Sequence, residues 1–128
     1  MQTQHRFVPA VLAFAIATAV AGASAAEPRV TSEVVESAMQ SEHAELRVTR
    51  IVEGLEHPWA LAFLPDGRKL ISERPGRLNL VDGDSIVQLD GLPEVATEGG
   101  RQGGLLDVVP HPDFASNGWI YFTYSSAG

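Results

Sequence analysis

The sequence predicts an all-β fold of the β-propeller type, and two observations lead to this prediction. The segment 61–73 contains a strand, a turn with proline and a second strand, and the segment 106–124 repeats this order after about 45 residues. The second copy ends in 119–124, which is rich in the aromatic and β-branched residues that strands favour. Repeats of roughly 40 to 50 residues are typical of propeller blades. Regular short strands also occur in β-sandwiches, so the repeat alone leaves that alternative open.

The first element in the chain is a predicted secretory signal peptide over residues 1–25. Arg6 contributes to a weakly basic start, residues 7–20 are apolar, and the three residues Ala-Ser-Ala ending at Ala25 fit the small-x-small cleavage pattern. An apolar run of about 14 residues is short for a membrane span, which needs about 20, so a retained anchor is the less favoured reading. We expect cleavage after Ala25, or alternatively after Ala26, and a periplasmic or secreted mature protein.

Residues 26–45 are polar and acidic, with few large apolar side chains. This composition predicts a linker or a short exposed helix. The strand pattern begins at Leu46, and residues 46–128 are predicted to form part of the propeller. We find no indication of a second domain.

The turns in the two repeats differ in length. In the first copy, Pro65, Asp66 and Gly67 suit a type I turn, with glycine accepting the left-handed conformation that closes a short hairpin. The second copy has a longer loop over 110–118, and the run Arg74 to Arg77 reads as a further tight turn. The strand aromatics are expected to fill the space between sheets rather than to form a sugar-stacking platform; they are Trp59, Phe63, Trp119, Tyr121 and Phe122.

A glycine-rich loop precedes the second copy of the repeat. Gly99, Gly100, Gly103 and Gly104 surround Arg101 and Gln102, and glycines allow positive φ or a close backbone approach. Gln102 can both donate and accept hydrogen bonds, so it is the candidate ligand contact in this loop. The alternative is a surface loop that binds nothing.

Charge and cysteine content exclude several functions. The formal net charge is −7, from 16 acidic and 9 basic residues, and the basic residues are scattered, so nucleic acid is not an expected partner. The chain has no cysteine, which excludes disulfides, thiolate catalysis and cysteine zinc sites.

The histidines and acidic residues give no catalytic or metal site. His57 and His111 each lie beside proline, where a structural turn role is expected. Strand alternation gives no reason for His111, Asp107 and Asp113 to converge. We therefore predict no catalytic residue and no metal ligand within this chain.

Several motifs in one order and spacing resemble the soluble, pyrroloquinoline quinone-dependent sugar dehydrogenases of the glucose/sorbosone dehydrogenase family. The matching stretches are Gly54-Leu-Glu-His-Pro-Trp-Ala-Leu-Ala-Phe-Leu-Pro-Asp-Gly67, Ser72-Glu-Arg-Pro-Gly-Arg-Leu78, Gly91-Leu-Pro-Glu-Val95, and Gln102-Gly-Gly-Leu-Leu-Asp-Val108 followed by His111-Pro-Asp-Phe114. Together they cover nearly all of the chain after residue 50.

This resemblance implies a six-bladed β-propeller that binds pyrroloquinoline quinone and calcium and passes electrons from a sugar substrate to an external acceptor. It places the quinone contact of the family's Gln-Gly-Gly-Leu-Leu segment on Gln102, and the catalytic histidine and main-chain calcium ligands on later blades. Six blades of about 45 residues need around 270 residues, so we expect an amino-terminal fragment containing the first one to two blades.

Two other functions remain open at the level of the sequence, because a fold does not determine a function. One is a non-catalytic propeller that binds a carbohydrate or a protein partner. The other is a lactonase-like hydrolase.

Overall fold

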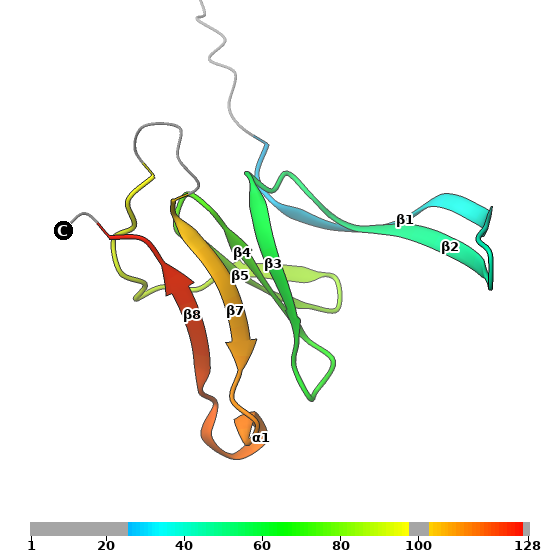
Figure 1. The fold of residues 1–128 in the computed structure, drawn as a ribbon. Coiled ribbons are helices and arrows are strands. Elements are labelled where there is room, and N and C mark those ends of the chain that lie inside the picture. The colour runs from blue at the N-terminus through cyan, green and yellow to red at the C-terminus, as the bar shows by residue number, and fades with distance from the viewer. Residues whose placement is uncertain (1–25, 98–102, 127–128) are drawn as a thin grey trace, which may run out of the picture.

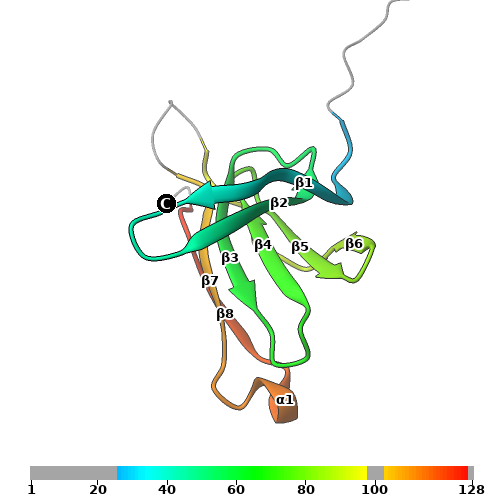
Figure 2. The same cartoon turned by 90° about the vertical axis from the view of Figure 1, so that its right-hand side faces the viewer.

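The structure is a computed structural model that describes residues 26–97 and 103–126. It contains three antiparallel sheets (Figures 1 and 2). The first is a hairpin of β1 (Arg29–Gln40) and β2 (Glu45–Glu53). The second has four strands in sequence order, β3 (Pro58–Phe63), β4 (Lys69–Glu73), β5 (Arg77–Asp82) and β6 (Ser85–Gln88). The third pairs β7 (Leu105–Pro110) with β8 (Ile120–Tyr124), which are joined through the short helix α1 (Phe114–Asn117).

The predicted strand–turn–strand repeat is present in both copies. In the first, β3 and β4 are joined by a tight turn in which Leu64 N donates to Arg68 O at 2.9 Å and Gly67 N donates to Leu64 O at 3.0 Å. Gly67 has a φ of 90°, the left-handed conformation that the Pro-Asp-Gly sequence predicts. In the second, β7 and β8 flank the longer loop that contains α1. Both turn predictions are confirmed.

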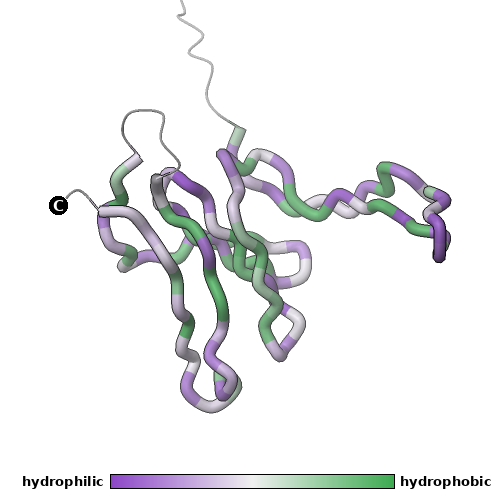
Figure 3. The backbone as a smooth tube through the Cα atoms, in the orientation of Figure 1, coloured by the Kyte–Doolittle hydropathy of each residue, from purple (hydrophilic) through white to green (hydrophobic). Residues whose placement is uncertain are grey.

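The core lies between the four-stranded sheet and the β7–β8 sheet, which stand side by side in both views (Figures 1 and 2). Its buried apolar residues are Ala62, Leu64, Leu70, Leu78, Leu105 and Val108. Figure 3 shows hydrophobic stretches along β7 and the strands of the neighbouring sheet. Each strand places alternate side chains on the inner face, as period-two geometry requires. The inner residues of β3, β4, β5 and β7 therefore form one apolar layer.

A buried hydroxyl also links the two sheets. Ser72 of β4 is fully buried, and its Oγ accepts a hydrogen bond from Ala60 N at 3.1 Å and donates to Leu106 O at 2.5 Å. This side chain therefore connects β3, β4 and β7 and satisfies polar groups that burial would otherwise leave unpaired.

Residues 29–40 form a strand, and the expected linker or short helix is wrong for this part of 26–45. The β1–β2 hairpin extends away from the other sheets (Figure 1). Strand pairing with β2 explains the difference, together with cross-strand ion pairs from Arg29 to Glu53 and from Arg50 to Glu33, both at 2.5 Å. β-Branched residues such as Val30 and Val34 suit this extended backbone.

The strand aromatics divide between the core and the outer faces of the sheets within the described chain, so their predicted packing between blades stays a prediction. Phe122 packs against the core, whereas Trp59, Phe63, Trp119 and Tyr121 are between 48% and 65% exposed. The reason is strand alternation: inner positions of β3 and β8 are occupied by Ala60, Ala62, Ile120 and Phe122, so the neighbouring side chains point to the opposite faces.

The described part of the chain contains no helix that is both long enough and apolar enough to cross a membrane. The predicted signal peptide, residues 1–25, lies outside the described residues. Its prediction therefore still rests on the sequence.

Leu70→Ala is expected to lower the free energy of unfolding by about 2–5 kcal/mol, because it leaves a cavity at a side chain that is 2% exposed. The measurement is urea unfolding followed by tryptophan fluorescence. Val87→Ala on β6 is the control, since Val87 is 57% exposed and its truncation should cost less than about 1 kcal/mol. Equal losses in the two variants would contradict this description of the core.

Candidate functional site

The candidate site lies at one end of the two packed sheets. Because β3 and β4 are antiparallel, the residues before β3 lie beside the residues after β4. Arg74 N donates to His57 O at 3.1 Å, and Leu105 N donates to Arg74 O at 3.1 Å. These bonds bring the start of β3, the end of β4 and the start of β7 together.

His57 has an unusual backbone conformation at this end. Its φ is 49°, the one positive value at a residue other than glycine within the described ranges. Such a conformation costs roughly 1–3 kcal/mol and persists where the surroundings enforce it. Here the carbonyl of His57 accepts the bond from Arg74, and Pro58 follows as the first residue of β3. The predicted structural turn role of His57 agrees with this contact.

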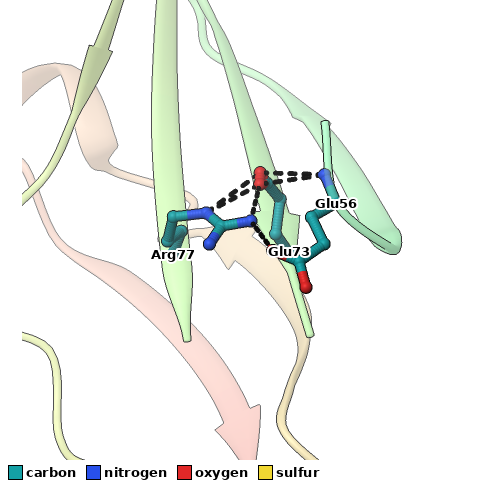
Figure 4. Close-up of polar contacts among 3 residues, drawn as sticks. All are labelled: Glu56, Glu73 and Arg77. Carbon is teal, nitrogen blue, oxygen red and sulfur yellow. Dashed lines mark hydrogen bonds and ion pairs between the residues drawn. The ribbon is translucent and has the colours of Figure 1, made fainter. Parts of the chain in front are cut away.

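A buried carboxylate supports the same end of the sheet (Figure 4). Glu73 is fully buried, and its carboxylate accepts hydrogen bonds from Arg77 Nε at 2.9 Å and from Glu56 N at 3.3 Å. The second guanidinium nitrogen of Arg77 lies 2.8 Å from Glu73 and 2.9 Å from Glu56 Oε2. The hydrogen bonds that Arg77 donates to Glu73, and then to Glu56, raise the pKa of Arg77. The guanidinium of Arg77 is permanently charged and contacts Glu73 through two nitrogens, so it compensates the buried negative charge of the carboxylate.

The expected tight turn at Arg74 to Arg77 is present, since Gly76 N donates to Glu73 O at 3.0 Å. An open pocket of about 330 Å³ lies beside this turn, lined by Glu56, His57, Arg74, Pro75 and Thr97. The pocket combines guanidinium, imidazole and hydroxyl donors with one carboxylate. Such a set of donors can bind an anionic oxygen.

Gly103 and Gly104 pass through this end with no room for a side chain. A Cβ on Gly104 would lie 2.1 Å from Arg74 O, and one on Gly103 would lie 2.5 Å from Ala96 O. Gly104 also has a φ of 122°. The expectation of positive φ or close backbone approach is confirmed for this pair. The close neighbours here are Arg74, which follows β4 of the four-stranded sheet, and Ala96 and Ser125.

Gln102, the predicted cofactor contact, and its neighbour Arg101 lie outside the described residues. Gln102 directly precedes Gly103 in the sequence. Its role as a ligand contact stays a prediction.

His111 lies in the loop after β7, at the end of that strand opposite to Gly104. Its Nδ1 accepts a hydrogen bond from Asp113 N at 2.9 Å, and its ring lies against Trp119 and Tyr121 with centroid distances of 6.0 and 5.8 Å. The turn role that the sequence predicts for His111 is therefore present. Within 26–97 and 103–126, no group of three or more histidine or acidic side chains could hold a metal ion.

Sequence reasoning missed three residues that build this end: Glu73, the side chain of Arg74, and Ser125. Arg74 Nε donates to Gly103 O at 3.1 Å, and Ser125 Oγ accepts from Gly104 N at 2.6 Å. The only available signal was the position of Glu73 and Arg74 at the end of a predicted strand. Nothing in the local pattern distinguishes Ser125 from an ordinary loop serine.

The family is shown by comparison with known proteins. The family model described as Glucose / Sorbosone dehydrogenase matches residues 55–128, which include the whole candidate site. The chain belongs to the glucose/sorbosone dehydrogenase family. The resemblance inferred from the motifs is thereby confirmed.

Two curated relatives and one solved structure illustrate the match to this family. An uncharacterized protein of Synechocystis sp. is 39% identical over 118 residues, covering 86% of this chain and 28% of the relative. An aldose sugar dehydrogenase of Escherichia coli K12 is 43% identical over 95 residues, covering 72% of this chain and 25% of the relative. The structure of the pyrroloquinoline quinone-bound aldose sugar dehydrogenase of Streptomyces coelicolor has a TM-score of 0.53 and 28% identity, covering 79% of this chain and 26% of that chain.

These matches establish the fold class and show what share of its relatives' length the chain covers. The all-β propeller prediction is confirmed, and the β-sandwich alternative is not. Within the described residues, the sheet β3–β6 has four strands in sequence order, and β7 and β8 form a separate pair. The chain spans about a quarter of the length of the curated relatives it matches.

Glu73→Gln is expected to lower the free energy of unfolding by about 1–3 kcal/mol, because the buried acceptor of Arg77 loses its charge while keeping its shape. The free energy is measured by urea unfolding at neutral pH. The matched control is Glu33→Gln, which weakens the exposed ion pair with Arg50 and should cost less than about 1 kcal/mol. A Glu73 variant as stable as the control would show that the buried pair is not a stabilising element.

Proposed function

We propose that this chain is part of an exported quinoprotein oxidoreductase that oxidises aldose sugars or related alcohols. Membership of the glucose/sorbosone dehydrogenase family is the observation that carries the proposal. The aldose sugar dehydrogenase of E. coli, at 43% identity, and the quinone-bound enzyme of S. coelicolor, at 28% identity, support it.

Pyrroloquinoline quinone is the proposed cofactor, and when bound it would accept a hydride from the sugar carbon. The donors beside the Arg74 turn fit such a group, because guanidinium, imidazole and hydroxyl groups bind the oxygens of a polycarboxylate. The carboxylate of Glu56 in the same pocket limits how many negative groups could approach. This fit concerns the chemistry of the donors, and the larger part of the binding site is proposed to lie in other blades.

Gln102 is the proposed cofactor contact within this chain. A neutral amide can hydrogen-bond to carbonyl or carboxylate oxygens in either redox state without imposing a charge. The two glycines that follow it in the sequence contact Arg74 at the end of β4, and this contact supports the proposal. We assign no catalytic base and no calcium ligand to this chain, and propose that both come from other parts of the parent protein.

The Gln102→Ala variant of the full-length parent protein is expected to bind pyrroloquinoline quinone about 3- to 10-fold more weakly, which corresponds to one or two lost hydrogen bonds. Binding is measured by titrating the quinone in the presence of calcium, and activity by sugar-dependent dye reduction. Gln40→Ala is the control, because Gln40 is exposed on the β1–β2 hairpin and bonds only locally to Glu45.

Saturable, calcium-dependent dye reduction by the wild-type protein would support the dehydrogenase. A full-length protein that neither binds the quinone nor reduces the dye would overturn the proposed dehydrogenase function. In that case, hydrolysis of sugar lactones would favour the hydrolase, and carbohydrate binding without turnover would favour a non-catalytic propeller.

Export is proposed from the amino-terminal sequence. Expression of the full-length gene in a bacterial host should yield a periplasmic or secreted protein whose first residue is Ala26, as determined by amino-terminal sequencing of the mature chain. A Lys substitution at Leu12 would interrupt the apolar run and should retain the protein, uncleaved, in the cytoplasm, whereas Lys at Thr3, in the polar start, should not. Recovery of the wild-type protein in the cytoplasm with residues 1–25 intact would contradict the proposed export.

A further inference from the structure

We propose that a pocket at the base of the β1–β2 hairpin holds the amino group of the mature chain, and that Glu56 is the ion-pair partner of this group. The group that occupies the pocket is then a primary ammonium, which removal of residues 1–25 creates on Ala26. The inference rests on the export part of the proposed function, because cleavage of the signal peptide exposes the amino group.

The described chain begins at the base of the hairpin (Figures 1 and 2). Arg29 of β1 pairs with Glu53 of β2, and the residues just before Arg29 lie against the residue just after Glu53. A Cβ on Gly54 would lie 2.9 Å from Ala26 O and 2.6 Å from Glu27 O. The first two described residues are therefore in close contact with the backbone that leads from β2 to β3.

A pocket of about 260 Å³ lies at this contact. The residues that line it include Ala26, Glu27, Glu56, Arg77 and Gln88. The sequence predicts cleavage after residue 25 or, alternatively, after residue 26. Either position leaves the new amino group on a residue of this lining.

The guanidinium of Arg77 does not neutralise the acidic groups around this pocket, because it faces two carboxylates (Figure 4). One of its terminal nitrogens lies 2.8 Å from Glu73 Oε1 and 2.9 Å from Glu56 Oε2. Glu73 is fully buried, whereas the side chain of Glu56 is 53% exposed. Together with Glu27, three carboxylates share one guanidinium. A primary ammonium is the group that compensates the excess negative charge.

Glu56 is held in place for this contact. Its backbone N donates to the two carboxylate oxygens of Glu73 at 3.3 and 3.4 Å, and its own carboxylate accepts from Arg77. A carboxylate has about four lone-pair sites, so it can accept from an ammonium while it remains bound to Arg77. The ammonium supplies up to three donors.

This ion pair makes the stability of the fold depend on pH. The charged groups around the amino group are Glu27 on its own segment, Glu56 before β3, and Arg77 on β5 with Glu73 of β4 behind it. The excess of carboxylates raises the pKa of the amino group above its ordinary value of about 7.7–8.0. The stabilisation is therefore fully present below that ordinary value and is lost as the pH rises through the raised pKa.

The test uses the mature parent protein released from a cleavable amino-terminal fusion, so that its first residue is chosen independently of export. One form begins at Ala26, and the other carries Gly-Ser before Ala26, which moves the ammonium away by two residues. Glu56→Gln removes the carboxylate charge in both forms. Glu42→Gln is the matched control, because the side chain of Glu42 is 88% exposed in the turn of the hairpin.

The first readout is the rate at which an amine-selective reagent labels the amino terminus at about pH 7.5, just below the ordinary pKa of an α-amino group. The labelled amino-terminal peptide is quantified by mass spectrometry. The second readout is urea unfolding of the two forms at about pH 6.5 and about pH 9.5, on either side of that pKa.

We expect the Ala26 form to be labelled about 1.5- to 5-fold more slowly than the Gly-Ser form, which is the range for a partly exposed ion pair. Glu56→Gln should largely remove this difference, and Glu42→Gln should leave it unchanged. The Ala26 form should also be the more stable one at about pH 6.5, with the difference lost at about pH 9.5. Equal labelling rates in the two wild-type forms, or a difference that Glu56→Gln does not reduce, would overturn the inference.

Failure of the proposed function would give a different result. The fusion-derived protein needs neither export nor the quinone, so the labelling rates test the pocket whatever the parent protein oxidises. Amino-terminal sequencing of the exported protein tests the premise, because a first residue other than Ala26 or Glu27 would overturn the role of the pocket in the mature chain. Should Glu56→Gln not fold, the two wild-type forms and their pH dependence decide the question, since both keep all side chains unaltered.

Discussion

Packing around Leu105 is the interaction on which the fold and the candidate site both depend. Leu105 is fully buried between the two sheets, beside Leu70 and Leu78 of the four-stranded sheet and Val108 of its own strand. Full burial of one such side chain contributes about 1.5–3 kcal/mol. The backbone of Leu105 also donates to Arg74 O, so the apolar layer ends where the polar site begins. The glycines before Leu105 are held in place because the strand that follows them is anchored in the core.

The polar residues at this end form contacts both within the four-stranded sheet and between the two sheets. Glu73 and Arg77 form an ion pair that joins the end of β4 to the start of β5. Removing one partner of such a pair destabilises the fold, because the other charge is left without compensation. Ser72, one residue earlier, links the same strand to β7. Arg74 therefore extends from a segment that is fixed on both sides, which suits a residue that anchors a neighbouring loop.

Local sequence patterns predicted the features that local chemistry decides. The turn closed by Gly67, the two strand–turn–strand copies, and the close backbone approach at Gly103 and Gly104 all follow from propensity and steric freedom. Residues 29–40 were not predicted as a strand, because polar residues alternate irregularly there and the pairing partner lies further along the chain. Tertiary pairing decides strand formation more often than propensity does. The joint anchoring by Arg74 and Ser125 could not be predicted, since the two residues are distant in sequence and meet only when the sheets pack.

The exposed apolar residues have a consistent place in this architecture. Trp59, Leu61 and Phe63 lie on the face of β3 that points away from the core, and Val109 and Tyr121 lie on the opposite side of the two-sheet stack. In a propeller each blade packs against a neighbour on either side, so an inner segment of the ring has an apolar face on both of its sides. The chain corresponds to about a quarter of its curated relatives, and two apolar faces are what such a portion presents.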